Sequence, residues 1–476
     1  MVVTDIETAR IDNGPYRAKS MLILAFACLL GATMWITVML PEWSGWTPPL
    51  LAIVPGFLTV VVMRSSIISA AYLVQVSVYF GIATLILGSD WHPRLVSAVL
   101  AWSLAIAAGT LIGGLSPQRT LPVSKPWPVP RWPHYALCSG LIGVDAFLTL
   151  SSRSGYAAQL VNGISTPTGI LGTLSAAAPI VTLALLLNSI GSDRRSRGAM
   201  VLAGAQLIVL ALSGFRGAGV VFIISIFVGA ALTLPRGSAW RRSSRLMIAF
   251  PVLMIAIVFT FIIGANVKNS AANEVGVSSS GTQLFTLDNA LKNTSTRLQL
   301  DSSLDTAIKY RGSAAAKEAV SWEKQLGAVV PRFLWPEKPI VDYGQRVSVA
   351  IYGMIYGQSS STVTTIGDAL LNFGSVGLAL IGLLVGFSVS RVEARMQRGL
   401  GSLSVVLVAV FVYSAIGQED PIILILVGIL RNGLVAGGLW VAATLTYSFV
   451  RQVPMLIDAK PGVEDSRPYG QEDKGA

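Results

Sequence analysis

Residues 421–450 read PIILILVGILRNGLVAGGLWVAATLTYSFV. This stretch is longer than the roughly 20 apolar residues that cross a bilayer, and a single cation, Arg431, interrupts it. A straight helix from Pro421 would place Arg431 roughly 15 Å deep, at about 1.5 Å per residue. A charge at that depth is costly, so its side chain is expected to face protein or water. Alternatively, 432–450 alone spans the membrane and 421–424 begins a re-entrant half-helix.

The composition extends this pattern to the whole chain. Of the 476 residues, 53% are hydrophobic and 12% are charged, which is about half the charged share of a soluble domain. We predict an all-α polytopic membrane protein with about twelve transmembrane helices. Besides 421–450, the apolar runs lie at 20–40, 48–63, 66–88, 95–115, 135–151, 168–190, 198–213, 217–234, 246–265, 366–388 and 401–417.

Lysine and arginine residues in the connections indicate the orientation of these helices. With the N-terminus in the cytoplasm, every inner connection is basic, whereas the short outer connections contain only Arg94, Arg153 and Arg216. The orientation predicts a cytoplasmic N-terminus (1–19), nine helices (20–265), a large outer loop (266–363), three more helices (364–450) and a cytoplasmic tail (451–476). The tail is expected to be disordered.

The connection at 266–363 is long enough to form a small structured unit, which is uncommon for a connection without a function. Loops of this length cross the membrane whatever their charge. Apolar spacing predicts one helix around Leu291, Leu298, Leu304 and Ile308, and a second at Trp322, Leu326 and Val329. We expect this loop to lie on the outer face as a lid over a cavity.

The sequence contains no nucleotide-binding motif and no zinc-binding motif. The cytoplasmic connections are too short for a nucleotide-binding domain, and no P-loop sequence occurs. Neither histidine, His92 or His134, belongs to a zinc-binding motif. We therefore expect no cofactor, no catalytic metal and no nucleic-acid partner. If the chain is an enzyme, its activated substrate must arrive through the membrane on a lipid.

The segment Ser213-Gly214-Phe215-Arg216-Gly217-Ala218-Gly219 joins two predicted helices at the outer face. Its glycines permit a tight turn, and the next helix begins with unpaired N–H groups at the positive end of its dipole. Together with the guanidinium of Arg216, this end of the helix suits an anion at the depth of lipid headgroups. Alternatively, Arg216 extends to water and binds no ligand.

The segment Pro331-Arg332-Phe333-Leu334-Trp335-Pro336-Glu337-Lys338-Pro339 closes the large loop. Its three prolines stiffen the backbone, and rings such as that of Trp335 settle at membrane interfaces. Arg332 and Lys338 would then lie at the level of phosphate groups. An interfacial anchor without a ligand is the alternative.

Two carboxylates are candidates for a general base facing the outer cavity. Asp368 ends the segment Thr365-Ile366-Gly367-Asp368, with Asn372 one turn later, but the same pattern is typical of a capping box. Asp342, which precedes Tyr343, is the alternative base. A proton acceptor of this kind is needed where a substrate hydroxyl attacks.

Two other cations also have plain structural interpretations. Arg431 can pair with Glu419 or Asp420. Arg297 lies four residues before Asp301, a spacing that gives a surface ion pair worth a few tenths of a kcal/mol. Both arginines remain candidates for substrate binding as well.

In its C-terminal half, the order of these motifs resembles the Wzy-type oligosaccharide repeat-unit polymerases, the O-antigen polymerase family of bacterial inner membranes. The matching pieces are Ser213-Gly214-Phe215-Arg216-Gly217, the large outer loop, Pro331-Arg332-Phe333-Leu334-Trp335-Pro336-Glu337-Lys338-Pro339, Gly367-Asp368-Ala369-Leu370-Leu371-Asn372-Phe373-Gly374 and Leu430-Arg431-Asn432-Gly433. The related ligases use a histidine in the large loop, and residues 266–363 contain none, which favours a polymerase.

The resemblance implies a metal-independent, GT-C-like membrane glycosyltransferase with both termini in the cytoplasm. It would move a growing glycan from undecaprenyl pyrophosphate onto a lipid-linked repeat unit, with a chain-length regulator as a further partner. It implies Asp368, or else Asp342, as the base, and cations that stabilise the pyrophosphate leaving group. The implied cations and further substrate contacts are Arg216, Arg332, Lys338, Arg431, Tyr343, Asn372, Arg297 and Trp335. An O-antigen ligase and a twelve-span transporter or flippase are the alternatives.

Overall fold

The computed structural model of the 476-residue chain describes residues 47–63, 65–82, 93–115, 130–151, 169–191, 197–214, 216–233, 300–326, 329–330, 343–354, 363–396, 402–415 and 420–458, with isolated residues between 256 and 270 and at 335 and 337. The described secondary structure is helical, and no strand occurs within these ranges. An all-α fold is therefore confirmed for the described residues.

Four helices are long and apolar enough to cross a membrane. They contain the stretches Arg94–Gly114, Ile170–Ile190, Thr365–Arg395 and Ile422–Val450. Shorter apolar helices occupy five other predicted runs, at Leu50–Val62, Ile67–Ile82, Arg197–Leu212, Gly217–Leu232 and Val405–Ala415. The total of twelve spans stays a prediction. The predicted run 20–40 lies outside the described residues.

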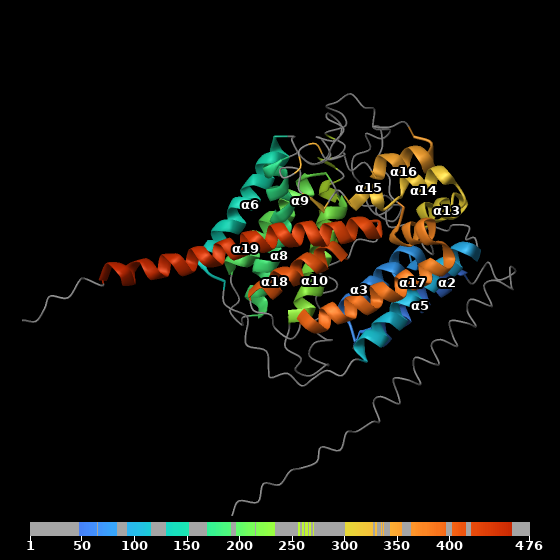
Figure 1. Ribbon diagram of the computed structural model, residues 1–476, viewed down its shortest axis with the longest axis horizontal. Helices are drawn as coiled ribbons and strands as arrows, with labels where there is room; N and C mark the ends of the chain where they lie inside the picture. The colour runs from blue at the N-terminus through green and yellow to red at the C-terminus, as the bar shows by residue number, and fades with distance from the viewer. Residues whose placement is uncertain are drawn as a thin grey trace, which may run out of the picture.

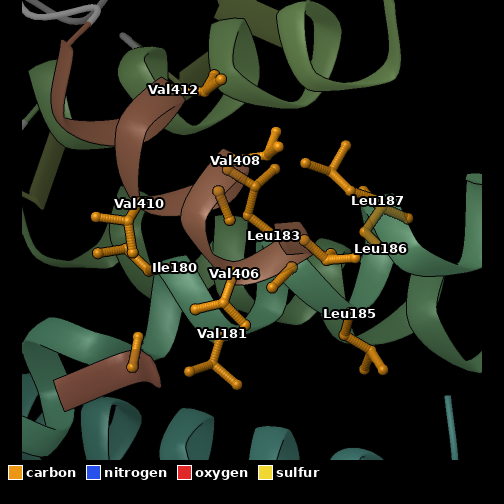
Figure 2. Packing of buried hydrophobic residues seen from close by; sticks show 14 of the residues in the cluster. Ile180, Val181, Leu183, Leu185, Leu186, Leu187, Val406, Val408, Val410 and Val412 are labelled. Atoms are coloured by element: carbon orange, nitrogen blue, oxygen red, sulfur yellow. The ribbon is translucent and has the colours of Figure 1, made fainter. Parts of the chain in front are cut away.

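The helices that match predicted transmembrane runs, called membrane-type helices below, form two neighbouring groups (Figure 1). One group consists of α6 (Trp132–Leu150), α8 (Ile170–Gly191), α9 (Arg197–Leu212), α10 (Arg216–Thr233), α18 (Ser402–Ala415) and α19 (Ile422–Asp458). The other consists of α2 (Thr47–Val62), α3 (Ile67–Val76), the π-helix η2 (Ser77–Ile82), α5 (Pro93–Gly114) and α17 (Thr365–Met396). Leucine, isoleucine and valine side chains of α8 and α18 interdigitate in the core of the first group (Figure 2).

Helices α5 and α17 pack in parallel with almost no space between their backbones. A Cβ atom on Gly109 would overlap the carbonyl oxygen of Leu383, and one on Gly386 would overlap that of Ile106. Gly113 lies one turn beyond Gly109 and makes a similar approach. Small residues four apart allow this close packing inside membranes, where burial of apolar surface contributes little to helix association.

A buried carboxylate at the far end of α17 fixes the start of α3. Glu393 accepts hydrogen bonds from the hydroxyl of Ser66 (2.7 Å) and from the backbone N–H groups of Ile67 (3.0 Å) and Ile68 (3.1 Å). These N–H groups have no acceptor within their own helix, because the first turn of a helix leaves its donors unpaired. The negative charge also complements the dipole of α3.

The large predicted loop contains four described helices, α13 (Asp301–Lys309), α14 (Ala314–Ala319), α15 (Glu323–Leu326) and α16 (Tyr343–Tyr352). They lie beside the start of α17 (Figure 1), and Ala307, Val320 and Tyr343 share a core cluster with Leu371 of α17. The first predicted loop helix is present in part as α13. The second is only the single turn α15, with Trp322 before it and Val329 beyond it.

The last apolar stretch forms one continuous helix. Helix α19 runs from Ile422 to Asp458 without a break, so the described structure contains the straight helix and not the re-entrant half-helix. It extends eight residues past 450, into the tail that was expected to be disordered. Leucine, valine and alanine favour helix over most of its length, and no proline falls between Pro421 and Pro454 to end it.

Candidate functional site

Asp368 lies in the first turn of α17 and is completely buried. The turn itself is capped by Thr364, whose hydroxyl accepts the N–H of Gly367 (3.1 Å) and whose carbonyl accepts the N–H of Asp368 (2.8 Å). The side chain of Asp368 is therefore free to point away from its own helix. The capping box suggested by the Thr365–Asp368 spacing is not formed, because Thr365 instead donates to the carbonyl of Asp420 (2.8 Å).

The carboxylate of Asp368 accepts four hydrogen bonds, two on each oxygen. Oδ1 receives Nδ2 of Asn372 (3.0 Å) and the hydroxyl of Tyr343 (3.3 Å). Oδ2 receives the backbone N–H of Ile422 (3.1 Å) and Nε1 of Trp322 (3.3 Å). An ionised carboxylate has about four acceptor positions, so these donors fill its capacity.

These four bonds join parts of the chain that are distant in sequence. Ile422 is the first residue of α19, so Asp368 acts as a cap for that helix and complements the positive end of its dipole. Tyr343 begins α16 and Trp322 precedes α15. Asp368 thereby connects the loop helices to the starts of two membrane-type helices, α17 and α19.

Tyr343 is the donor of this group that can ionise. Burial, and then the negative charge of Asp368, raises the pKa of its phenol well above the ordinary value. The hydroxyl therefore keeps its proton at neutral pH and remains a hydrogen-bond donor to Asp368.

Two further contacts extend the cluster toward the surface. Asn372 also approaches the carbonyl of Val320 (3.4 Å), at the end of α14. Trp322 packs edge to face against Phe373, with ring centroids 4.9 Å apart, and Phe373 is 42% exposed. The buried polar cluster thus lies directly under an aromatic surface.

Helix α17 breaks at Gly374, immediately after this aromatic residue. Gly374 has φ 71° and ψ −171°, a left-handed conformation that is not helical and that favours glycine. Backbone groups around the break are released from the regular helical pattern. Arg311, an exposed residue between α13 and α14, places Nη2 only 3.3 Å from where a Cβ of Gly374 would lie.

No local sequence signal pointed to Arg311 or to Trp322 as site residues. Arg311 comes just after the short amphipathic helix α13, a position at which solvent-exposed cations are common. Its proximity to Gly374 arises only from tertiary packing. The apolar spacing places Trp322 on a helix face, whereas in the structure its indole N–H donates to the buried carboxylate of Asp368.

Three of the predicted site residues meet in this cluster: Tyr343, Asp368 and Asn372. Trp335 is 44% exposed. Arg431 is half-buried in α19, about 13.5 Å along the helix from its first residue. Its Nε donates to the side chain of its neighbour Asn432 (3.4 Å).

The remaining predicted residues are only partly placed. Arg216 is the first residue of α10, and the structure describes its backbone but not its side chain. The turn before it contains Gly214 with φ 76°, as the predicted tight turn requires. Four predicted residues lie outside the described residues altogether: Arg297, Arg332, Lys338 and Asp342.

In this conformation Asp368 is poorly suited to accept a proton from a substrate. Its side chain has no solvent-accessible surface, and neutral donors occupy both of its oxygens. Among the described residues, no group of three histidine, cysteine or acidic side chains is arranged to hold a metal ion. The geometry instead favours a positioning role for Asp368, because its carboxylate joins Trp322 and Tyr343 of the loop to the start of α19.

No family model matches this chain, and no curated protein or solved structure is found to be similar to it.

Proposed function

We propose that this protein is a polysaccharide repeat-unit polymerase of the bacterial inner membrane. It transfers a growing glycan from undecaprenyl pyrophosphate onto a lipid-linked repeat unit at the outer face. The order of its motifs, which resembles that of the Wzy-type polymerases, supports this class. The absence of a nucleotide-binding motif in the sequence is consistent with a lipid-linked donor.

The observation that carries the proposal is the joining of the loop to the membrane-type helices at Asp368. It assembles a polar and aromatic patch from Trp322, Asn372 and Phe373 where a membrane-type helix begins. Aromatic and amide side chains of this kind suit the mixed apolar and hydroxyl surface of a sugar. Arg311 adds a positive charge at the edge of the same patch.

The proposed reaction divides the work between cations and a base. The acceptor hydroxyl forms the new glycosidic bond as the bond from the donor sugar to the pyrophosphate oxygen breaks. The bonding electron pair leaves on the pyrophosphate, whose charge Arg216, Arg332 and Lys338 stabilise, with Arg311 and Arg431 in support. The hydroxyl proton passes to Asp342, because the four donors on Asp368 favour a positioning role for that residue.

A transporter or flippase is the second candidate, and one observation favours it. Asp145 is a buried carboxylate inside α6, bonded to side chains of α8 and α9 rather than to helix ends. Ionisable residues within membrane helices often belong to transport pathways. A ligase, which would pass a finished glycan to a different acceptor, is separated from a polymerase by the reducing end of its product.

Glycan analysis in cells that lack the chromosomal copy tests the proposal. The cells carry the wild-type chain, Arg216→Ala, or the control Arg197→Ala, which removes an exposed arginine at the opposite end of α9. We expect lipid-linked single repeats to accumulate with Arg216→Ala at a normal protein level, and polymer to persist with the control. Unchanged chain length with Arg216→Ala, or transport without polymer in vesicles that contain the wild-type protein, would refute the proposal.

A further inference from the structure

A second polar cluster lies among α6, α8 and α9. Asp145 of α6 accepts the hydroxyl of Ser175 on Oδ1 (2.6 Å) and the amide Nε2 of Gln206 on Oδ2 (2.8 Å). Asp145 and Ser175 are each 7% exposed and Gln206 is not exposed at all. Three different helices therefore direct oxygen-bearing side chains to one buried point.

The three side chains lie at one depth in the bundle. Asp145 is five residues before the end of α6 and Ser175 is five residues after the start of α8, so each is about 7.5 Å from that end. Gln206 is six residues before the end of α9, which corresponds to about 9 Å. In the predicted orientation this is the outer end of the bundle.

The charge of Asp145 has no cationic partner in the described helices. Both hydrogen-bond donors are neutral, and no described lysine or arginine forms an ion pair with it. Among the described residues, Tyr413 of α18 also interacts with Asp145, and its phenol is neutral when protonated. An uncompensated buried carboxylate is strongly unfavourable. Because the described residues leave the charge of Asp145 unbalanced, we expect a proton or a bound cation to balance it.

An unsatisfied oxygen favours the bound cation over the proton. Oε1 of Gln206 is buried and has no hydrogen-bond partner. If Asp145 were protonated, it could donate to this amide oxygen only after the amide had flipped, and Nε2 would then lose its acceptor. A cation held between the carboxylate and Oε1 satisfies the charge and the amide oxygen together. The hydroxyl oxygen of Ser175 offers a further ligand while its proton stays on Asp145.

We propose that Asp145, Ser175 and Gln206 form a binding site for a small, hard monovalent cation, for which Na⁺ is the natural probe. Carboxylate, amide and hydroxyl oxygens are the ligands that hard cations prefer. One carboxylate matches a single positive charge, whereas divalent sites usually contain more acidic ligands. The site is distinct from the Asp368 cluster, and the inference does not depend on the proposed polymerase function.

Binding of ²²Na⁺ to the purified full-length protein tests this site at constant ionic strength, with choline as the replacing cation. We expect saturable binding of one ion per chain, together with a rise in melting temperature that choline does not produce. Asp145→Asn should weaken binding at least roughly 10- to 100-fold, by analogy with the loss of ligand-sphere residues in other ion sites. Ser175→Ala should weaken it less, since the carboxylate and amide remain.

The control substitution is Thr182→Val, two turns further along α8, where the threonine hydroxyl contacts Cys138 (3.1 Å). It changes a buried polar contact between the same two helices and should leave Na⁺ binding intact. If Asp145→Asn does not fold, the weakening in Ser175→Ala decides the question. The proposal is overturned if the wild type binds no Na⁺, if stability follows pH but not Na⁺, or if the folded Asp145→Asn variant binds as the wild type does.

Discussion

Replacing Asp368 by asparagine tests whether this residue holds the loop in place or serves as the base. Asparagine has the same shape, but one of its two terminal atoms is an NH₂ group, which cannot accept a hydrogen bond. In either orientation of the amide, two of the four donors lose their acceptor. They are Trp322 and Ile422 in one orientation and Tyr343 and Asn372 in the other.

The expected effect follows from those two stranded donors. Each buried donor without a partner costs about 1–3 kcal/mol, so the contact between loop and helices should weaken by about 2–6 kcal/mol. Since about 1.4 kcal/mol corresponds to a tenfold change, local opening should become between about 30-fold and about 20,000-fold more frequent. The amide of Ile422 and the amides of α13, α14 and α16 report this opening.

Hydrogen exchange followed by mass spectrometry measures these amides in the full-length protein. The matched control is Glu393→Gln, which alters the carboxylate that caps α3 from the other end of α17. It should speed exchange at the first turn of α3 and leave the loop unchanged. If Asp368→Asn abolishes polymer formation while loop exchange stays at the wild-type rate, the positioning role is wrong and the base assignment is favoured.

Three further substitutions test the surrounding structure. Gly109→Ala should lower the stability of the protein by about 1–3 kcal/mol or more, because the new Cβ would overlap the backbone of α17. Gly140→Ala, which has open space around it, should raise the stability by about 0.5–1 kcal/mol. Thermal unfolding in detergent compares the two variants. Trp322→Phe should destabilise the loop by about 1 kcal/mol, since it removes one hydrogen bond and keeps the aromatic packing; exchange of loop amides measures this. Arg311→Ala should shorten the polymer, because it removes the positive charge at the edge of the proposed substrate patch. Lys317→Ala removes another exposed cation of the loop and should not shorten it. Gel electrophoresis of the glycan measures the chain length.

The membrane-type helices were predictable because their signal is local. Runs of apolar residues give both ends of α5 and α8 and the starts of α17 and α19 to within a few residues, although α17 continues to Met396 and α19 to Asp458. The close packing of α5 on α17 also leaves a readable trace in the small residues of each helix, Gly109 with Gly113 and Gly382 with Gly386. These patterns depend only on residues within one helix.

The arrangement of the candidate site could be predicted only in part. Tyr343, Asp368 and Asn372 were named from motifs, but the function of the carboxylate depends on Ile422, which is 54 positions away. A backbone N–H leaves no trace in the identity of its residue, so the capping of α19 has no sequence pattern. Arg311 was missed for the same reason, because its relation to Gly374 arises from packing.

The positions of the buried carboxylates distinguish their functions. Asp368 and Glu393 are 25 residues apart and lie near the two ends of α17. In a helix that spans the membrane they would lie near opposite interfaces, where each compensates the charge of a helix start. Among the described residues, Asp145 bonds to side chains inside α8 and α9 and to no helix start. Its charge therefore requires a different compensation, which is the physical basis for expecting an ion there.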